Sequence, residues 1–317
     1  MEAVQQLVQH IKTNIGQVIV GKETIIEHVI IALLAEGHLL LEDVPGTGKT
    51  VLARSLAQSL AIDFKRVQFT PDLLPTDLSG VHLYNQKEGD FIFREGPLFT
   101  QLLLADEINR ATPRTQSALL ECMEEKQISI NGETKQLLRP FFVIATQNPI
   151  EQQGTFPLPE AQLDRFLMRV SVGYPEQEEG VQLLQRFIHD NPLQQLKAVV
   201  YPNEIINAIN YCRQVKANDD VLRYIVNIVE ATRIDERILT GVSPRGSQSL
   251  LRAAQVKAAI HGREFIIPDD VKQLAIPVLA HRLVLKGINR SKQVAEHIIE
   301  QIMSTITIPT ETELTAK

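Results

Sequence analysis

The first half of the chain carries short runs of consecutive apolar residues, separated by segments in which apolar residues recur at helical spacing. Apolar runs without alternation are typical of strands buried on both faces, as in a parallel sheet covered by helices. The pattern therefore predicts an α/β fold. Its strands are expected near Leu39–Leu41, Phe64–Phe69, Leu102–Ala105, Phe141–Ala145 and Leu167–Val172.

Two stretches of this half alternate apolar and polar residues around a polar tip. One is Gly80–Leu98, and the other is Gln127–Leu138, whose tip is Asn131-Gly132. Alternation around an Asn-Gly pair is a strong hairpin signal. The sequence therefore predicts two β-hairpin inserts, which serve either a function or simply as connectors.

From about residue 175 the chain becomes a succession of amphipathic helices. Pro244 and Pro268 stand where helices would begin, and Asp219 is a plausible N-cap. The helices are predicted at Glu178–His189, Pro202–Gln214, Asp219–Glu236, Pro244–His261 and Pro268–Lys286. An α/β domain over residues 1–175 and a helical domain over 176–317 are the expected organisation.

Composition narrows the possible partners and compartment. The net charge of -6 argues mildly against a general nucleic-acid or anionic-membrane surface. The chain has two cysteines, Cys122 and Cys212, without metal-ligand spacing, which is typical of a reducing compartment. No apolar stretch is long enough to cross a bilayer. We expect a cytoplasmic protein without membrane insertion.

The first apolar strand runs directly into Asp43-Val44-Pro45-Gly46-Thr47-Gly48-Lys49-Thr50 and then into a helical pattern from Val51. This is the setting of a phosphate-binding loop, in which glycines allow backbone N–H groups to face phosphate oxygens. Lys49 would reach the β- and γ-phosphates, and the Thr50 hydroxyl would hold Mg²⁺. Asp43 departs from the general pattern, which opens with glycine. The sequence predicts a nucleotide site with Mg²⁺.

Other polar residues follow the predicted strands. Asp106 and Glu107 end one strand, where Asp106 would bind Mg²⁺ and Glu107 would activate the attacking water. Asn148 ends another and could contact the water or the γ-phosphate, but on spacing alone an Asn-Pro turn is the better explanation. Arg165 and Arg245 lie at helix ends, where arginines are usually just solvated.

Four segments together resemble the AAA+ ATPases, and within them the MoxR family. They are Glu42–Thr50, Ala105–Ala111, Glu160–Phe166 and Gly241–Gly246, and the resemblance covers the chain from about Gln17 to Leu285. The implied fold is a P-loop NTPase core with hairpin inserts, followed by a helical lid.

The resemblance also implies residue roles. Asn148 matches sensor 1, and Arg245 matches sensor 2, where the lid touches bound nucleotide. Arg165 matches the arginine finger that acts on the neighbouring subunit's nucleotide, with Arg169 a lesser candidate for such contacts. Val20 and Gly21, within the apolar turn Val18–Gly21, match the connector beside the adenine, a turn that by itself would more simply face the core.

The implied activity is ATP hydrolysis by a homo-oligomeric ring, expected to be a hexamer. Such a ring would remodel or mature a client complex, together with a von Willebrand factor A-domain protein. A nucleotide-dependent binding switch with slow hydrolysis and a magnesium-chelatase-like ATPase subunit remain alternatives. A nucleic-acid motor is disfavoured by the acidic charge and by the polar tip at residues 86–90.

Overall fold

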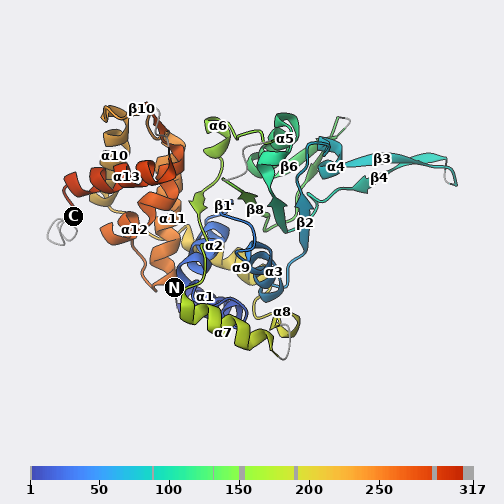
Figure 1. Ribbon diagram of the computed structural model, residues 1–317, viewed down its shortest axis with the longest axis horizontal. Coiled ribbons are helices and arrows are strands. Elements are labelled where there is room, and N and C mark those ends of the chain that lie inside the picture. The colour runs from blue at the N-terminus through green and yellow to red at the C-terminus, as the bar shows by residue number, and fades with distance from the viewer. Residues whose placement is uncertain are drawn as a thin grey trace.

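The computed structural model describes residues 2–87, 89–130, 132–149, 154–188, 192–287 and 291–309. The turn residue Asn131, residue Glu88 of the first hairpin tip, His189 and the last residues, 310–317, lie outside this range. In Figure 1 a central α/β part carries a long hairpin on one side and a group of helices on the other.

The core of the α/β part is a five-stranded sheet with the order β2-β5-β8-β1-β9, and every neighbouring pair is parallel. Its strands are β1 (Leu39–Glu42), β2 (Phe64–Gln68), β5 (Leu102–Asp106), β8 (Phe142–Gln147) and β9 (Met168–Val170). All five predicted strands are confirmed. Parallel pairing places the carboxyl ends of all five at one edge of the sheet.

The central strands β1, β5 and β8 are buried on both faces, which is why they are almost continuously apolar, whereas the outer strand β2 also carries Lys65, Arg66 and Gln68. Successive residues of β5 enter different clusters: Leu102 and Leu104 pack in one, and Leu103 and Ala105 pack in the other. Helices cover the first face, including α1 (Glu2–Gly16), α2 (Glu23–Leu34) and α3 (Lys49–Ser59). On the second face lie α5 (Pro113–Glu125) and the short α4 (Pro75–Ser79).

Both predicted hairpins are present. β3 (Gly80–Asn85) pairs with β4 (Asp90–Glu95), and β6 (Gln127–Ile130) pairs with β7 (Glu133–Gln136). The first projects well beyond the rest of the molecule (Figure 1). Whether the hairpins have a function stays a prediction.

The second half is helical, as predicted, with different details near its end. Its elements are α7 (Gln177–Phe187), α8 (Pro192–Gln195), α9 (Pro202–Cys212), α10 (Asp219–Ile234), α11 (Pro244–Ile260), α12 (Pro268–Leu279) and α13 (Lys292–Thr305). The second half also contains the short elements η2 (Ala280–Arg282), β10 (Ile238–Thr240) and β11 (Val284–Leu285). Two short elements of the first half are η1 (Ile108–Arg110) and α6 (Glu160–Leu163).

Two local predictions in this half were wrong. The helix from Pro268 ends at Leu279, because β11 then pairs antiparallel with β10. The N-cap of α10 is Asn218, whose side chain accepts a hydrogen bond from the Val221 N–H at 2.9 Å, and Asp219 is the first helical residue. Helix α13 was not predicted.

The helical half packs directly on the first helices of the chain. Helix α11 contacts α1 and α2. One apolar cluster contains residues from both halves of the chain, from Val4 of α1 to Met303 of α13. Glu27 of α2 forms ion pairs with Lys12 of α1 and Lys257 of α11. A domain boundary near residue 175 stays a prediction. Among the described residues, no helix combines the length and apolarity that a membrane span requires.

Candidate functional site

The phosphate loop joins β1 to α3 at the carboxyl edge of the sheet. Gly46 and Gly48 have φ of 85° and 88°, a region that favours glycine, and a Cβ at either position would meet no atom within 4 Å. Gly48 is also the N-cap residue of α3, so the amino end of that helix opens into the loop. The backbone is therefore shaped to receive an anion from the open side.

Lys49 is held inside this loop. Its Nζ donates to the carbonyl oxygens of Asp43 at 2.9 Å and Val44 at 2.8 Å. Burial lowers the pKa of Lys49 from its ordinary value, although the carboxylates of Asp43, Asp106 and Glu107 oppose that shift. The carbonyl groups of the loop thus hold the ammonium group in place.

Asp43 stands where the general loop pattern has glycine, and its buried carboxylate has a structural use. Oδ1 accepts from the Val44 N–H at 2.8 Å, and Oδ2 accepts from the Gly173 N–H at 2.6 Å. The departure therefore ties the base of the loop to the segment that follows β9.

The acidic pair ends β5, beside the loop. Asp106 Oδ1 accepts from the Thr146 hydroxyl at 2.6 Å, and Oδ2 accepts from Arg66 Nη2 at 2.6 Å. The Glu107 N–H donates to the same Thr146 hydroxyl at 2.8 Å. Thr146 of β8 thus holds both acidic residues in place, while Arg66 of β2 pairs with the first.

Glu107 has the left-handed backbone conformation, with φ of 57°. Its Oε2 accepts from Gln68 Nε2 at 2.6 Å and lies 3.1 Å from Arg110 Nε. A non-glycine residue in this region costs free energy and persists only where its surroundings hold it. The contacts of Glu107 from β2, η1 and β8 hold it there.

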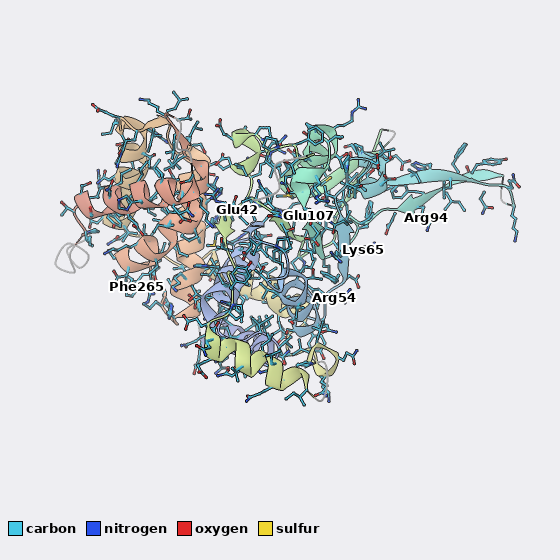
Figure 2. All side chains as sticks on the ribbon, in the orientation of Figure 1. Glu42, Arg54, Lys65, Arg94, Glu107 and Phe265 are labelled. Atoms are coloured by element: carbon cyan, nitrogen blue, oxygen red, sulfur yellow. The ribbon has the colours of Figure 1, made fainter. Side chains whose placement is uncertain are left out.

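These residues surround one cavity of about 400 Å³. Figure 2 shows Glu107 near the centre of the molecule, far from Arg94 on the projecting hairpin. The wall of this cavity includes nine of the residues predicted for the site: Pro45, Gly46, Gly48, Lys49, Thr50, Val51, Asp106, Glu107 and Asn148. The Thr50 hydroxyl and the Asp106 carboxylate are oxygen donors on the same wall, a set that suits Mg²⁺.

Three residues on this wall, Arg66, Gln68 and Thr146, were not predicted. Arg66 and Gln68 are polar positions inside an otherwise strand-like run, and Thr146 is a polar residue at the end of another. That signal identifies strand ends. It does not say which strands are neighbours, and β2-β5-β8 is the order that brings these side chains to Asp106.

Val20 and Gly21 do not line this cavity. Gly21 lies against Glu179, whose Oε1 would be 1.8 Å from a Cβ at that position. Lys22 Nζ donates to the Tyr174 carbonyl at 2.9 Å. The segment after β9 therefore packs on the connector that precedes α2, and an adenine contact for Val20 and Gly21 stays a prediction.

Arg165 and Arg245 lie elsewhere, in a second pocket of about 240 Å³. Arg165 Nη2 is 3.1 Å from Glu124 Oε2, and Arg245 Nη1 is 3.1 Å from Glu124 Oε1. Residues 36–38, which precede β1, line this pocket, so it lies at the amino edge of the sheet. The phosphate cavity is at the other edge, at least about 10 Å away along β1.

The structure therefore brings the two arginines to each other and not to the cavity of their own chain. Arg245 does not line the cavity of its own chain, because α11 begins beside the amino edge of the sheet, and its contact with bound nucleotide stays a prediction. Arg169, the lesser candidate, lies 3.6 Å from Glu42 with a side chain 13% exposed.

Known proteins match this chain over most of its length. Residues 38–168 match the model of the ATPase family associated with various cellular activities, and residues 230–302 match the AAA lid domain. The chain is 39% identical to Chaperone MoxR1 of Mycobacterium tuberculosis, over 93% of this chain and 81% of that protein. It is 32% identical to Protein MoxR of Methylorubrum extorquens, over 93% of each.

The chain belongs to the MoxR family of AAA+ ATPases. It is also 48% identical to Uncharacterized protein YeaC of Bacillus subtilis, over 93% of each chain. A solved structure from Cytophaga hutchinsonii, which carries a provisional ATPase assignment, superposes with a TM-score of 0.89. The two chains are 38% identical, and the superposition covers 97% of this chain and 96% of the Cytophaga chain. The predicted family and the predicted AAA+ core with a helical lid are thus confirmed, and ATP is the substrate class of the MoxR family.

Proposed function

We propose that this MoxR-family protein hydrolyses ATP only as a ring, with each active site shared between two subunits, and that it uses the cycle to remodel a client protein. The observation that carries this proposal is the separation of the site into two parts. The phosphate loop and acidic pair share one cavity, and Arg165 and Arg245 share another at the opposite edge of the sheet.

Within one chain, the loop and Lys49 would bind the phosphates of ATP, and Thr50 and Asp106 would hold Mg²⁺. The metal, when bound, neutralises charge that develops on the phosphates. Glu107 would orient and deprotonate the attacking water, with Asn148 close by on the same wall. Gln68 and Arg110 both contact Oε2 of Glu107, which fixes one of its two carboxylate oxygens in place.

Lys49 and Arg66 supply positive charge on the wall of this cavity, and we propose that further cations reach the γ-phosphate from a neighbouring subunit. Cations placed there stabilise the charge of the transition state and increase the rate by about 10³–10⁵ in related phosphoryl-transfer systems. Arg165 and Arg245 face away from their own cavity, so we assign both to the nucleotide of a neighbouring subunit. An isolated subunit would then bind ATP and hydrolyse it slowly.

A head-to-tail contact of this kind closes into a ring when the rotation between subunits permits it, and a hexameric ring is the proposed assembly. The name of the relative Chaperone MoxR1 supports a remodelling role. We propose a von Willebrand factor A-domain protein as the partner that links the ring to its client. The hairpin β3–β4 exposes Leu83, Tyr84 and Phe91, which fits a surface that contacts another protein.

The ATPase rate per subunit, measured against protein concentration, tests the shared site. For the wild type we expect the specific rate to climb with concentration, because each site is completed by a neighbour. Arg165→Ala is expected to stay at least about 10³-fold lower at every concentration while its affinity for ATP is retained. A wild-type rate independent of concentration and of Arg165 would instead favour a switch that hydrolyses ATP slowly as single subunits.

A further inference from the structure

Glu124 directly connects Arg165 and Arg245, the two arginines that we assign to a neighbouring subunit's nucleotide. It lies near the carboxyl end of α5, and each of its carboxylate oxygens is 3.1 Å from a different arginine. Arg165 follows α6, and Arg245 lies in the first turn of α11. Three distant parts of the sequence therefore meet at one carboxylate.

The backbone segments that carry the two arginines are already fastened together. The Ser243 hydroxyl donates to Asp164 Oδ2 at 3.0 Å, and buried Arg282 forms an ion pair with Asp164. Arg282 Nη2 also donates to the Phe166 carbonyl at 2.7 Å. The starting points of the Arg165 and Arg245 side chains are thus fixed, and their long side chains converge on Glu124.

The two guanidinium groups would separate without a shared anion. Two like charges about 5 Å apart repel by roughly 1 kcal/mol even in water, and flexible side chains relieve this by turning outward. The side chains of Arg165 and Arg245 are 29% and 40% exposed, so each has solvent to turn into. Glu124 is the acceptor that opposes this.

The same contacts leave the arginines able to bind a phosphate. Glu124 binds Nη2 of Arg165 and Nη1 of Arg245, so further N–H donors of each guanidinium remain for another anion. Partly exposed ion pairs contribute little stability, about 0–1 kcal/mol, so the arginines can readjust toward a phosphate at small cost.

We propose that Glu124 is a positioning residue, which holds Arg165 and Arg245 side by side as a single site for the γ-phosphate of a neighbouring subunit's ATP. The inference rests on the proposed function, since it requires that the arginines act on the next subunit. Glu124 itself touches no substrate and lies at the amino edge of the sheet.

The test is the neutral variant Glu124→Gln, assayed at protein concentrations where the wild-type rate has reached its plateau. We expect kcat to fall roughly ten-fold. Arginine fingers increase the rate by about 10³-fold or more, and misplaced guanidinium groups of Arg165 and Arg245 would lose part of that increase. The KM for ATP should stay close to the wild-type value, since ATP is bound by the other subunit's loop. The control Glu121→Gln removes the same charge from the same helix and should keep the wild-type kcat.

A double-variant measurement separates positioning from general damage. In an Arg245→Ala background, Glu124→Gln should lower kcat by only roughly two-fold, because one of the two arginines it aligns is gone. A full ten-fold loss in that background would overturn the proposal. Two results for the single variant Glu124→Gln would also overturn it. One is an unchanged kcat, and the other is a raised kcat, which would mean that Glu124 blocks the arginines.

Arg165→Ala, run in the same assay, distinguishes the two proposals. If it loses activity and Glu124→Gln does not, the shared site stands and the role of Glu124 is refuted. If Arg165→Ala keeps full activity, the shared site is refuted and the role of Glu124 with it.

Discussion

Replacing Thr146 by valine tests how the acidic pair is held. The Thr146 hydroxyl donates to Asp106 Oδ1 at 2.6 Å and accepts from the Glu107 N–H at 2.8 Å. Valine has nearly the same shape and neither hydrogen-bonding capacity. Thr146 is 1% exposed, and a methyl group of valine fills the place of the hydroxyl. The Glu107 N–H loses this acceptor, and Asp106 keeps only its contact with Arg66.

The two losses can be estimated separately. A hydrogen bond to a charged group contributes about 1.5–3 kcal/mol, and a buried N–H left without a partner costs about 1–3 kcal/mol. We therefore expect Thr146→Val to lower the free energy of unfolding by about 3 kcal/mol. Thr146→Ser keeps the hydroxyl and loses one methyl group, which costs about 1 kcal/mol.

Urea unfolding followed by circular dichroism measures both variants against the wild type. The ATPase rate adds a second measurement, because Glu107 with φ of 57° is expected to relax once its N–H is unpaired. Thr146→Ser should retain most of the activity and Thr146→Val little of it. If valine proved as stable and as active as serine, the hydroxyl would not be what orients the acidic pair.

Two further predictions concern buried groups outside the acidic pair. Burial lowers the pKa of His38 to about 4, so its ring is neutral in the fold. The unfolded chain binds this proton more readily, so the stability linked to His38 should be fully present above pH 6.5 and be lost as the pH falls toward 4. The slope from His38 is up to about 1.4 kcal/mol per pH unit, and His38→Gln should reduce it in urea midpoints measured across this range. It should not abolish the slope, since the pKa values of His28 and His281 are also lowered by burial. Asp43→Gly restores the general loop pattern but removes the acceptor of the Gly173 N–H, so we expect a loss of about 2–3 kcal/mol in unfolding free energy. A glycine variant as stable as the wild type would show that Asp43 does not fasten the loop.

The parts of the site that follow one another along the chain could be predicted from the sequence. Gly46, Gly48 and Lys49 lie between a strand and a helix, and the residue types required there are local. Asp106 and Glu107 end a buried strand, and parallel strands bring their carboxyl ends to one edge. Residue order and periodicity were therefore enough to predict the phosphate cavity.

Contacts between distant segments were decided by the tertiary structure. Arg66 and Thr146 meet Asp106 only because β2 and β8 flank β5, and several strand orders are compatible with the same apolar runs. The meeting of Arg165 and Arg245 at Glu124 depends on how α11 docks beside the end of α5.

The sequence by itself thus determined the family, the class of fold and the chemistry of the phosphate cavity, because these are written in contiguous residues. Only the tertiary structure decided that the two arginines lie at the opposite edge of the sheet, paired through one carboxylate. The physical reason is that helix packing and strand order depend on many weak nonlocal contacts, and no single motif in the sequence specifies them.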